Sequence, residues 1–94
     1  MREYELMVIV HSDLAEDGLA NTVDTIREWA SAAGTVVKID NWGRRRFTYP
    51  IRKLLEGNYI LFNLELEPTA ISELERNLRL SEEVLRHLLV RVSE

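Results

Sequence analysis

The 94-residue sequence contains no cysteine, only two histidines and only four glycines. Without cysteine the chain has no disulfide, no thiolate metal site and no thiol nucleophile. The two histidines are not accompanied by an HExxH motif or clustered carboxylates, and the four glycines form no phosphate-binding loop. We therefore expect no metal, no cofactor and no small-molecule substrate, and we predict that the protein is not an enzyme.

The sequence also lacks long hydrophobic runs. None approaches the ~20 apolar residues that a membrane-spanning helix requires. The N-terminal segment MREYELMVIV has an acidic start and a short apolar run, so we expect no signal peptide. A hydrophobic content of 46% with 30% charged residues is typical of soluble globular proteins. We predict a single domain over residues 1–94, located in the cytoplasm and without membrane contact.

Apolar patterning predicts the element order β-α-β-β-α-β. Residues 4–10 alternate as a strand, and apolar residues at helical spacing from Leu19 to Ala33 predict an amphipathic helix that ends at Gly34. Asp13 and Glu16 have the spacing of a helix-capping box. The other predicted elements are a strand over 35–51, a turn in LLEGN at 54–58, a strand over 59–66, a helix over 68–80 with Thr69 as N-cap, and a strand over 84–92.

This order predicts an α+β, ferredoxin-like fold, with a four-stranded antiparallel sheet and two helices on one face. The first and third strands should be central, and the second and fourth should be edges. Pro50 favours an edge position because proline cannot donate to a neighbouring strand, and Gly43 could mark a bulge. The sheet face away from the helices, here called the open face, is expected to carry Met7, Ile9, Tyr59 and Leu61. Since an exposed antiparallel face is normally polar, we expect a partner to cover part of it.

A block of basic residues interrupts an otherwise acidic chain. The net charge is −4, from 12 basic and 16 acidic residues, yet residues 44–53 contain five basic residues and no acidic one. This basic block consists of Arg44, Arg45, Arg46, Arg52 and Lys53. Arginine suits phosphate geometry through its planar donors, although a basic edge can also simply prevent sheet aggregation. Without a bulge, alternation would turn Phe47, Tyr49 and Ile51 toward the core and the even-numbered arginines outward.

Other proteins of this fold class provide alternatives. An RNA recognition motif places several aromatic residues on the open face of the third strand, and here only Tyr59 is expected there, which argues against base stacking. An acylphosphatase-like enzyme needs an anion-binding loop after the first strand, but that segment, VHSDLAEDG, is acidic. Trp42 is expected to pack or to anchor an interface, and its place beside the arginines leaves stacking open. A homodimerising or regulatory module that pairs through its open face is the alternative function.

The segment GRRRFTYPI, residues 43–51, together with MREYE at the N-terminus and the long helix between them, resembles bacterial ribosomal small-subunit protein six. The characteristic run of that family is Gly, any residue, a basic residue, a polar or charged residue, Leu, a small residue, Tyr, any residue, Ile, and a basic or small residue. Residues 43–52 follow this run, with Phe47 in place of the usual Leu and Thr48 in place of Ser or Ala. The resemblance extends over essentially the whole chain.

The resemblance implies a structural, non-enzymatic component of the bacterial small ribosomal subunit. It further implies binding to the central domain of small-subunit ribosomal RNA together with ribosomal small-subunit protein eighteen, a small basic protein, as a heterodimer. A basic partner would complement the acidic remainder of this chain. RNA contact is assigned to Arg2, Arg44, Arg45, Arg46, Arg52 and Lys53, and contact with the partner protein to Met7, Ile9, Tyr59, Leu61 and Trp42.

Overall fold

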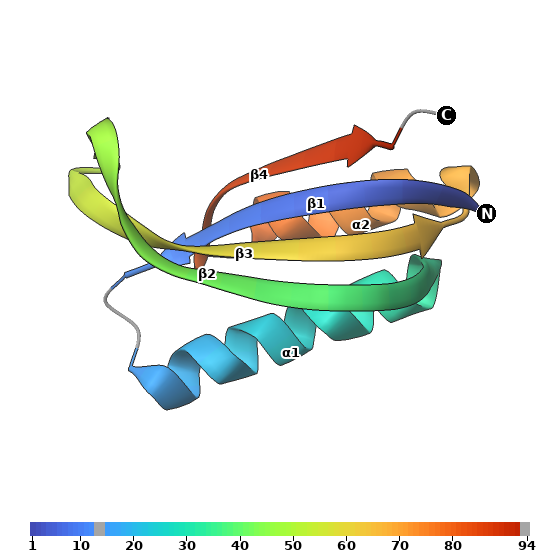
Figure 1. Cartoon of the computed structure of the whole chain (residues 1–94), viewed down its shortest axis with the longest axis horizontal. Coiled ribbons are helices and arrows are strands. Elements are labelled where there is room, and N and C mark those ends of the chain that lie inside the picture. The colour runs from blue at the N-terminus through green and yellow to red at the C-terminus, as the bar shows by residue number, and fades with distance from the viewer. Residues whose placement is uncertain (13–14, 93–94) are drawn as a thin grey trace.

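The computed structural model describes residues 1–12 and 15–92 (Figure 1). Its elements are β1 (Arg2–His11), α1 (Glu16–Ala33), β2 (Gly34–Ile51), β3 (Leu54–Leu66), the 3-10 turn η1 (Pro68–Ala70), α2 (Ile71–Leu80) and β4 (Val84–Arg91). This order confirms the predicted one. The predicted capping box cannot be followed, because Asp13 lies outside the described residues.

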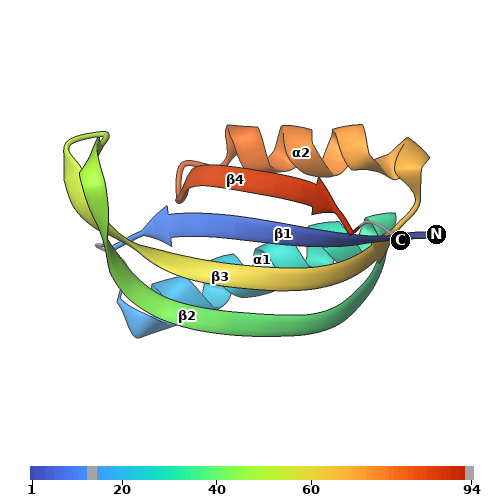
Figure 2. The same ribbon diagram turned by 45° about the horizontal axis from the view of Figure 1, so that its top comes forward.

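The strands form one sheet with the order β2-β3-β1-β4, in which every neighbouring pair is antiparallel. Strands β1 and β3 are therefore central, and β2 and β4 are the edges. Figure 2 shows α1 behind the sheet and α2 above β4, and residues of both helices pack in one cluster with the buried residues of β1 and β3, which leaves the other face of the sheet open. The ferredoxin-like fold predicted from the sequence is confirmed.

The core lies between the sheet and the two helices. Alternate residues of β1 and β3 are buried because successive side chains of a strand point to opposite faces. Phe62 is fully buried at the centre of β3, and Ile26 of α1 and Leu74 of α2 pack in the same cluster. Burying each such side chain stabilises the fold by about 1.5–3 kcal/mol.

Helix α1 ends where the sequence predicts, at Gly34, but the reason differs from the expected left-handed cap. The φ angle of Gly34 is 167°, which is extended backbone that any residue can adopt. Glycine is required instead because β2 passes close to β3 at this point. A Cβ at Gly34 would overlap the backbone oxygen of Glu65 and lie 2.9 Å from the Cα of Leu66.

The second helix begins later than predicted. Thr69 is not its N-cap, because Pro68–Ala70 form a 3-10 turn and Ala70 precedes the first helical residue. The backbone N–H of Ala70 donates to the carbonyl of Glu67 over 2.9 Å, which tightens this turn. The side chain of Thr69 makes no capping hydrogen bond.

The position of the hairpin between β2 and β3 also differs from the prediction. LLEGN does not form the turn, because Gly57 and Asn58 pair with Arg45 and Arg44 inside the sheet. The chain reverses instead at Arg52 and Lys53, whose φ angles are 51° and 66°. These two basic residues form a two-residue loop closed by the pair of Ile51 and Leu54.

Candidate nucleic-acid interface

The β2–β3 hairpin extends past the ends of β1 and β4 and bends away from α1 (Figures 1 and 2). Two irregularities in the pairing of β2 with β3 lie in this part. One is between Asn41 and Gly43, where Gly43 has a φ of 84°, and the other is between Arg46 and Ile51. Bulges of this kind bend a strand and increase its twist. Pro50 lies in the second unpaired segment, where its missing N–H costs no ladder hydrogen bond.

The bulge before Gly43 changes which face the residues of β2 occupy. Ile39 and Asn41 pair with the core residues Phe62 and Ile60, whereas Gly43 pairs with Tyr59 of the open face. The inserted residue is Trp42. Odd-numbered residues of β2 therefore face the core between the register shift at Val37 and Trp42, and the open face directly after Trp42.

The prediction that Phe47, Tyr49 and Ile51 face the core is consequently wrong. The ring of Phe47 lies 6.3 Å from that of Tyr59, measured between centroids, and the ring planes are tilted by 54°. It also passes over Gly57, where an added Cβ would be 2.7 Å from the Phe47 Cζ atom. Tyr49 is 66% exposed. Aromatic residues therefore gather at the hairpin end of the open face.

Alternation already divides the basic block between the two sides of β2, and the same bulge exchanges those sides. Arg44 points toward the helix side, where its Nη2 donates to the carbonyl of Ser12 over 3.1 Å and its Nη1 lies 3.7 Å from Glu56 Oε1. The guanidinium of Arg45 lies over the Trp42 ring, 5.2 Å from its centroid. Such a contact keeps the charge exposed while it orients both side chains.

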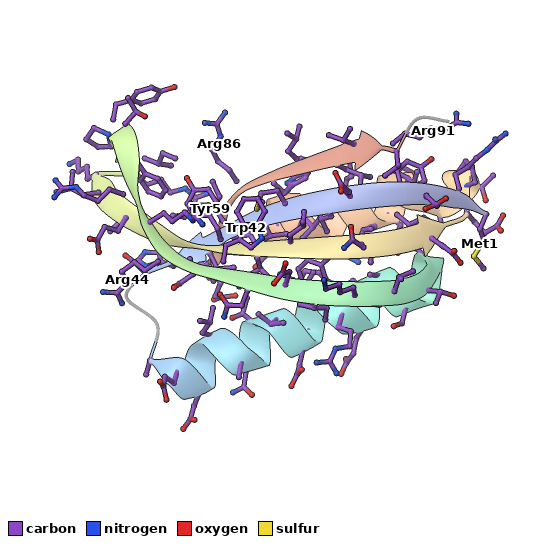
Figure 3. The ribbon with its side chains drawn as sticks, viewed as in Figure 1. Met1, Trp42, Arg44, Tyr59, Arg86 and Arg91 are labelled. Carbon is purple, nitrogen blue, oxygen red and sulfur yellow. The ribbon has the colours of Figure 1, made fainter. Side chains whose placement is uncertain are left out.

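Five of the six predicted RNA-binding residues thus lie in the hairpin end: Arg44, Arg45 and Arg46 on β2, and Arg52 and Lys53 at the tip. Arg2 does not join them. It pairs with Leu66 at the far end of the sheet, whereas His11 at the other end of β1 pairs with Gly57. An extended strand of this length separates Arg2 from His11 by about 30 Å. Figure 3 shows Met1 and Arg44 at opposite ends of the molecule.

The residues predicted to contact a partner protein share the open face. Met7 pairs with Leu61 and Ile9 with Tyr59, and all four are partly exposed. Figure 3 shows Trp42 beside Tyr59. Strand β4 extends this apolar surface with Leu88, which is 64% exposed.

The apolar surface has opposite charges at its two ends. Beyond Met7 and Leu61, away from the hairpin, the same face carries three acidic residues, Glu3, Glu5 and Glu65, together with Asn63 and Lys38. At the hairpin end, Arg86 of β4 pairs with Ile9 and joins Arg45 on the cationic side. The open face is therefore acidic at one end, apolar in the middle and cationic with aromatic rings at the other end.

Sequence reasoning missed Phe47, Tyr49 and Arg86 as site residues. Uninterrupted alternation places Phe47 and Tyr49 in the core, and only the bulge before Gly43 moves them to the open face. Arg86 cannot be placed from the sequence, because apolar residues occupy both alternating sets of positions in the last strand and alternation does not fix its faces. The register of β4 shifts between Ile9 and Val10 of the neighbouring strand, which buries both Val84 and Leu85.

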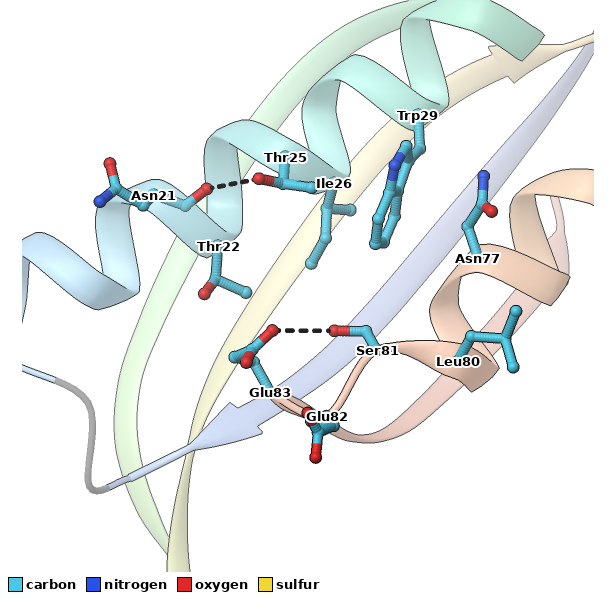
Figure 4. Close-up of a pocket in the computed structure, with 10 residues that line it drawn as sticks. All are labelled: Asn21, Thr22, Thr25, Ile26, Trp29, Asn77, Leu80, Ser81, Glu82 and Glu83. Atoms are coloured by element: carbon cyan, nitrogen blue, oxygen red, sulfur yellow. Dashed lines mark hydrogen bonds between the residues drawn. The ribbon is translucent and has the colours of Figure 1, made fainter.

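A further hollow lies elsewhere, between α1, α2 and the segment before β4 (Figure 4). It measures about 480 Å³ and is lined by Trp29, Glu82 and Glu83 among others, with no basic residue. The hydroxyl of Ser81 donates to Glu83 over 3.3 Å on one side of it. Because its only charges are negative, this hollow is unsuited to phosphate.

Within residues 1–12 and 15–92, no three His, Cys, Asp or Glu side chains are grouped so that they could hold a metal ion. The helices in the same part of the chain are too short or too polar to cross a membrane.

Residues 3–91 match the model of a family described as ribosomal protein S6. The chain belongs to this family. A small ribosomal subunit protein bS6 from Salinispora arenicola is 48% identical over 92 residues, which cover 97% of this chain and 96% of the relative. The bS6 protein of Heliobacterium modesticaldum is 40% identical over 95 residues, covering 100% of this chain and 99% of the relative.

The fold agrees with a solved member of the family. The crystal structure of 30S ribosomal protein S6 from Thermotoga maritima superposes with a TM-score of 0.92 at 28% identity, covering 97% of this chain and 87% of the other. The family predicted from GRRRFTYPI is confirmed. Membership makes the protein a structural component of the small ribosomal subunit, located with ribosomes in the cytoplasm, and not an enzyme.

Proposed function

We propose that this S6 family member binds the central domain of small-subunit ribosomal RNA through its hairpin end, and does so as a heterodimer with ribosomal small-subunit protein eighteen. The observation that carries the proposal is the concentration of five cations in one protruding hairpin of a chain whose net charge is −4. Phosphate neutralisation supplies much of the affinity for RNA. A protruding hairpin can bring these cations to the RNA without bringing the acidic remainder of the protein close to it.

The backbone of the hairpin tip supports a functional role for its charges. Two-residue loops with positive φ at both positions favour Asn-Gly, yet this loop holds Arg52 and Lys53. A non-glycine residue in the left-handed region costs about 1–2 kcal/mol. Strain that a better turn sequence would remove is typical of positions retained for function.

The open face supports the heterodimer. Its apolar centre is continuous across β3, β1 and β4, because Met7 pairs with both Leu61 and the exposed Leu88, and contiguous exposed apolar surface is typical of protein–protein contacts. The acidic end beside it, with Glu3, Glu5 and Glu65, suits a basic protein. The basic partner would then occupy the apolar and acidic part of the face, and the RNA the cationic hairpin.

The test is a titration of the protein and its basic partner with a central-domain fragment of small-subunit ribosomal RNA at several salt concentrations. Five neutralised phosphates give a slope of log affinity against log salt of about −3.5 to −4.5. Replacing Arg44, Arg45 and Arg46 with alanine should reduce the magnitude of the slope by about 2–2.7 and weaken binding. Unchanged affinity would refute the proposal.

The matched control removes the same charge from the helix side. Arg27, Arg76 and Arg79 are exposed residues of α1 and α2. Their replacement with alanine should leave the salt slope unchanged. If both triple variants weaken binding equally, net charge rather than the hairpin determines affinity.

A homodimer through the open face is the second candidate. Two copies in antiparallel orientation would place the cationic end of each face against the acidic end of the other, which the charge distribution favours. Sedimentation of the isolated protein distinguishes the two. A stable dimer that RNA and the basic partner leave intact supports the homodimer, and a monomer excludes it.

A further inference from the structure

We infer that the hollow beneath the bent hairpin binds one unstacked nucleotide of the RNA, with its base against aromatic rings and its phosphate beside Arg46 and Arg86. The inference rests on the proposed RNA binding and adds that a base, as well as the phosphate backbone, contacts the protein. It reverses the expectation from the sequence, based on Tyr59 alone, which argued against base stacking on this face.

The hollow measures about 180 Å³ and is lined by residues of all the strands that meet there. They include Ile9, Arg46, Phe47, Tyr49, Tyr59 and Arg86. Figure 3 shows Tyr59 and Arg86 at the hairpin end of the sheet. Pockets for whole small molecules usually measure about 300–1,000 Å³, so this one suits a single planar ring system.

The rings are available for stacking. Phe47 and Tyr59 are tilted by 54° with respect to each other, so they do not cover each other's faces. Tyr49 stands beside them and is 66% exposed. Single-stranded RNA is recognised mainly by unstacked bases on aromatic side chains, with arginines beside the phosphates.

The charges favour a nucleotide over the basic partner protein. Arg46 and Arg86 form no salt bridge with any described residue, so both charges are free for an anion. Arg86 also lines a second hollow of about 250 Å³ together with Met7 and Leu88. Arg86 therefore lies between the cationic, aromatic hollow and this second, apolar hollow. Its charge and that of Arg46 would repel a basic protein from the aromatic hollow.

The test uses the full chain with its basic partner protein and the central-domain ribosomal RNA fragment as probe. Phe47→Leu and Tyr49→Leu each remove a ring while keeping an apolar side chain. Each should weaken binding about tenfold, equal to about 1.4 kcal/mol, and leave the salt slope unchanged because no charge is lost. Val37→Ala is the control, since Val37 is an exposed apolar residue of β2 far from the hollow.

A second readout locates the base directly. Ultraviolet irradiation of the wild-type complex should crosslink a nucleotide to the peptide that contains Phe47 and Tyr49, or to the one that contains Tyr59. Since Tyr49 is largely exposed, its replacement leaves the fold intact and keeps the test valid if Phe47→Leu misfolds.

The outcomes separate this inference from the proposed function. If the wild-type protein does not bind the RNA fragment, the proposed function fails and the inference with it. If wild type binds and both ring variants bind equally well, the base does not enter the hollow, while phosphate binding stands. If the ring variants instead reduce the salt slope, the rings only position arginines and the inference is overturned.

Discussion

Replacing Lys53 with glycine should stabilise the fold and weaken RNA binding at the same time. Lys53 has a φ of 66° in the two-residue hairpin loop, where glycine is favoured. The substitution also removes one of the five charges of the basic block. The two consequences have separate physical causes, so two independent measurements can detect them.

The size of the stability change follows from the backbone. A non-glycine residue in the left-handed region costs about 1–2 kcal/mol, which glycine removes. Glycine loses about 0.5–1 kcal/mol more conformational freedom on folding, so the net gain should be about 0.5–1 kcal/mol. For a domain of this size that gain corresponds to an increase in Tm of about 2–8 °C.

Urea unfolding measures the first effect and the salt dependence of RNA binding the second. Lys53→Ala is the matched control, because alanine removes the charge and retains the strain. Both variants should reduce the magnitude of the salt slope by about 0.7–0.9, the value for one phosphate contact. If Lys53→Gly is no more stable than Lys53→Ala, the left-handed backbone at Lys53 does not destabilise the loop. If neither variant changes the salt slope, Lys53 does not contact an RNA phosphate.

Two further substitutions test other parts of the structure. Gly34→Ala should destabilise the protein by at least about 3 kcal/mol in urea unfolding, because its Cβ would overlap the rigid backbone at Glu65. The control Thr35→Ala, at the neighbouring exposed residue, should change the stability by no more than about 0.5 kcal/mol. If Gly34→Ala were tolerated, this would contradict the close approach of β2 and β3. Glu56→Gln should tighten RNA binding in the salt titrations, because Glu56 lies 3.7 Å from Arg44 and partly neutralises it. The exposed pair contributes about 1 kcal/mol or less to stability, so weaker binding by that variant would mean that Glu56 positions Arg44.

Much of the fold could be predicted because it depends on regular local patterns. Alternation in β1 identifies its buried residues, such as Leu6 and Val8, and helical spacing identifies Ile26 in α1 and Leu78 in α2. The basic block is likewise visible as a run of charge. These features need only the two periods of regular secondary structure, 3.6 residues for a helix and 2 for a strand.

The sequence by itself thus determined the element order, the buried stripes, the edge position of β2 and the family resemblance. Only the tertiary structure decided where β2 changes faces and where the hairpin turns. Both depend on how β2 pairs with β3: the extra residue at Trp42 moves Phe47 from the core to the open face, and Gly57 stays in the sheet beneath that ring. A one-residue change in register exchanges the two faces of a strand, and pairing with a distant segment sets that register. The cluster of aromatic rings at the hairpin end can be recognised only once the register of β2 against β3 is known.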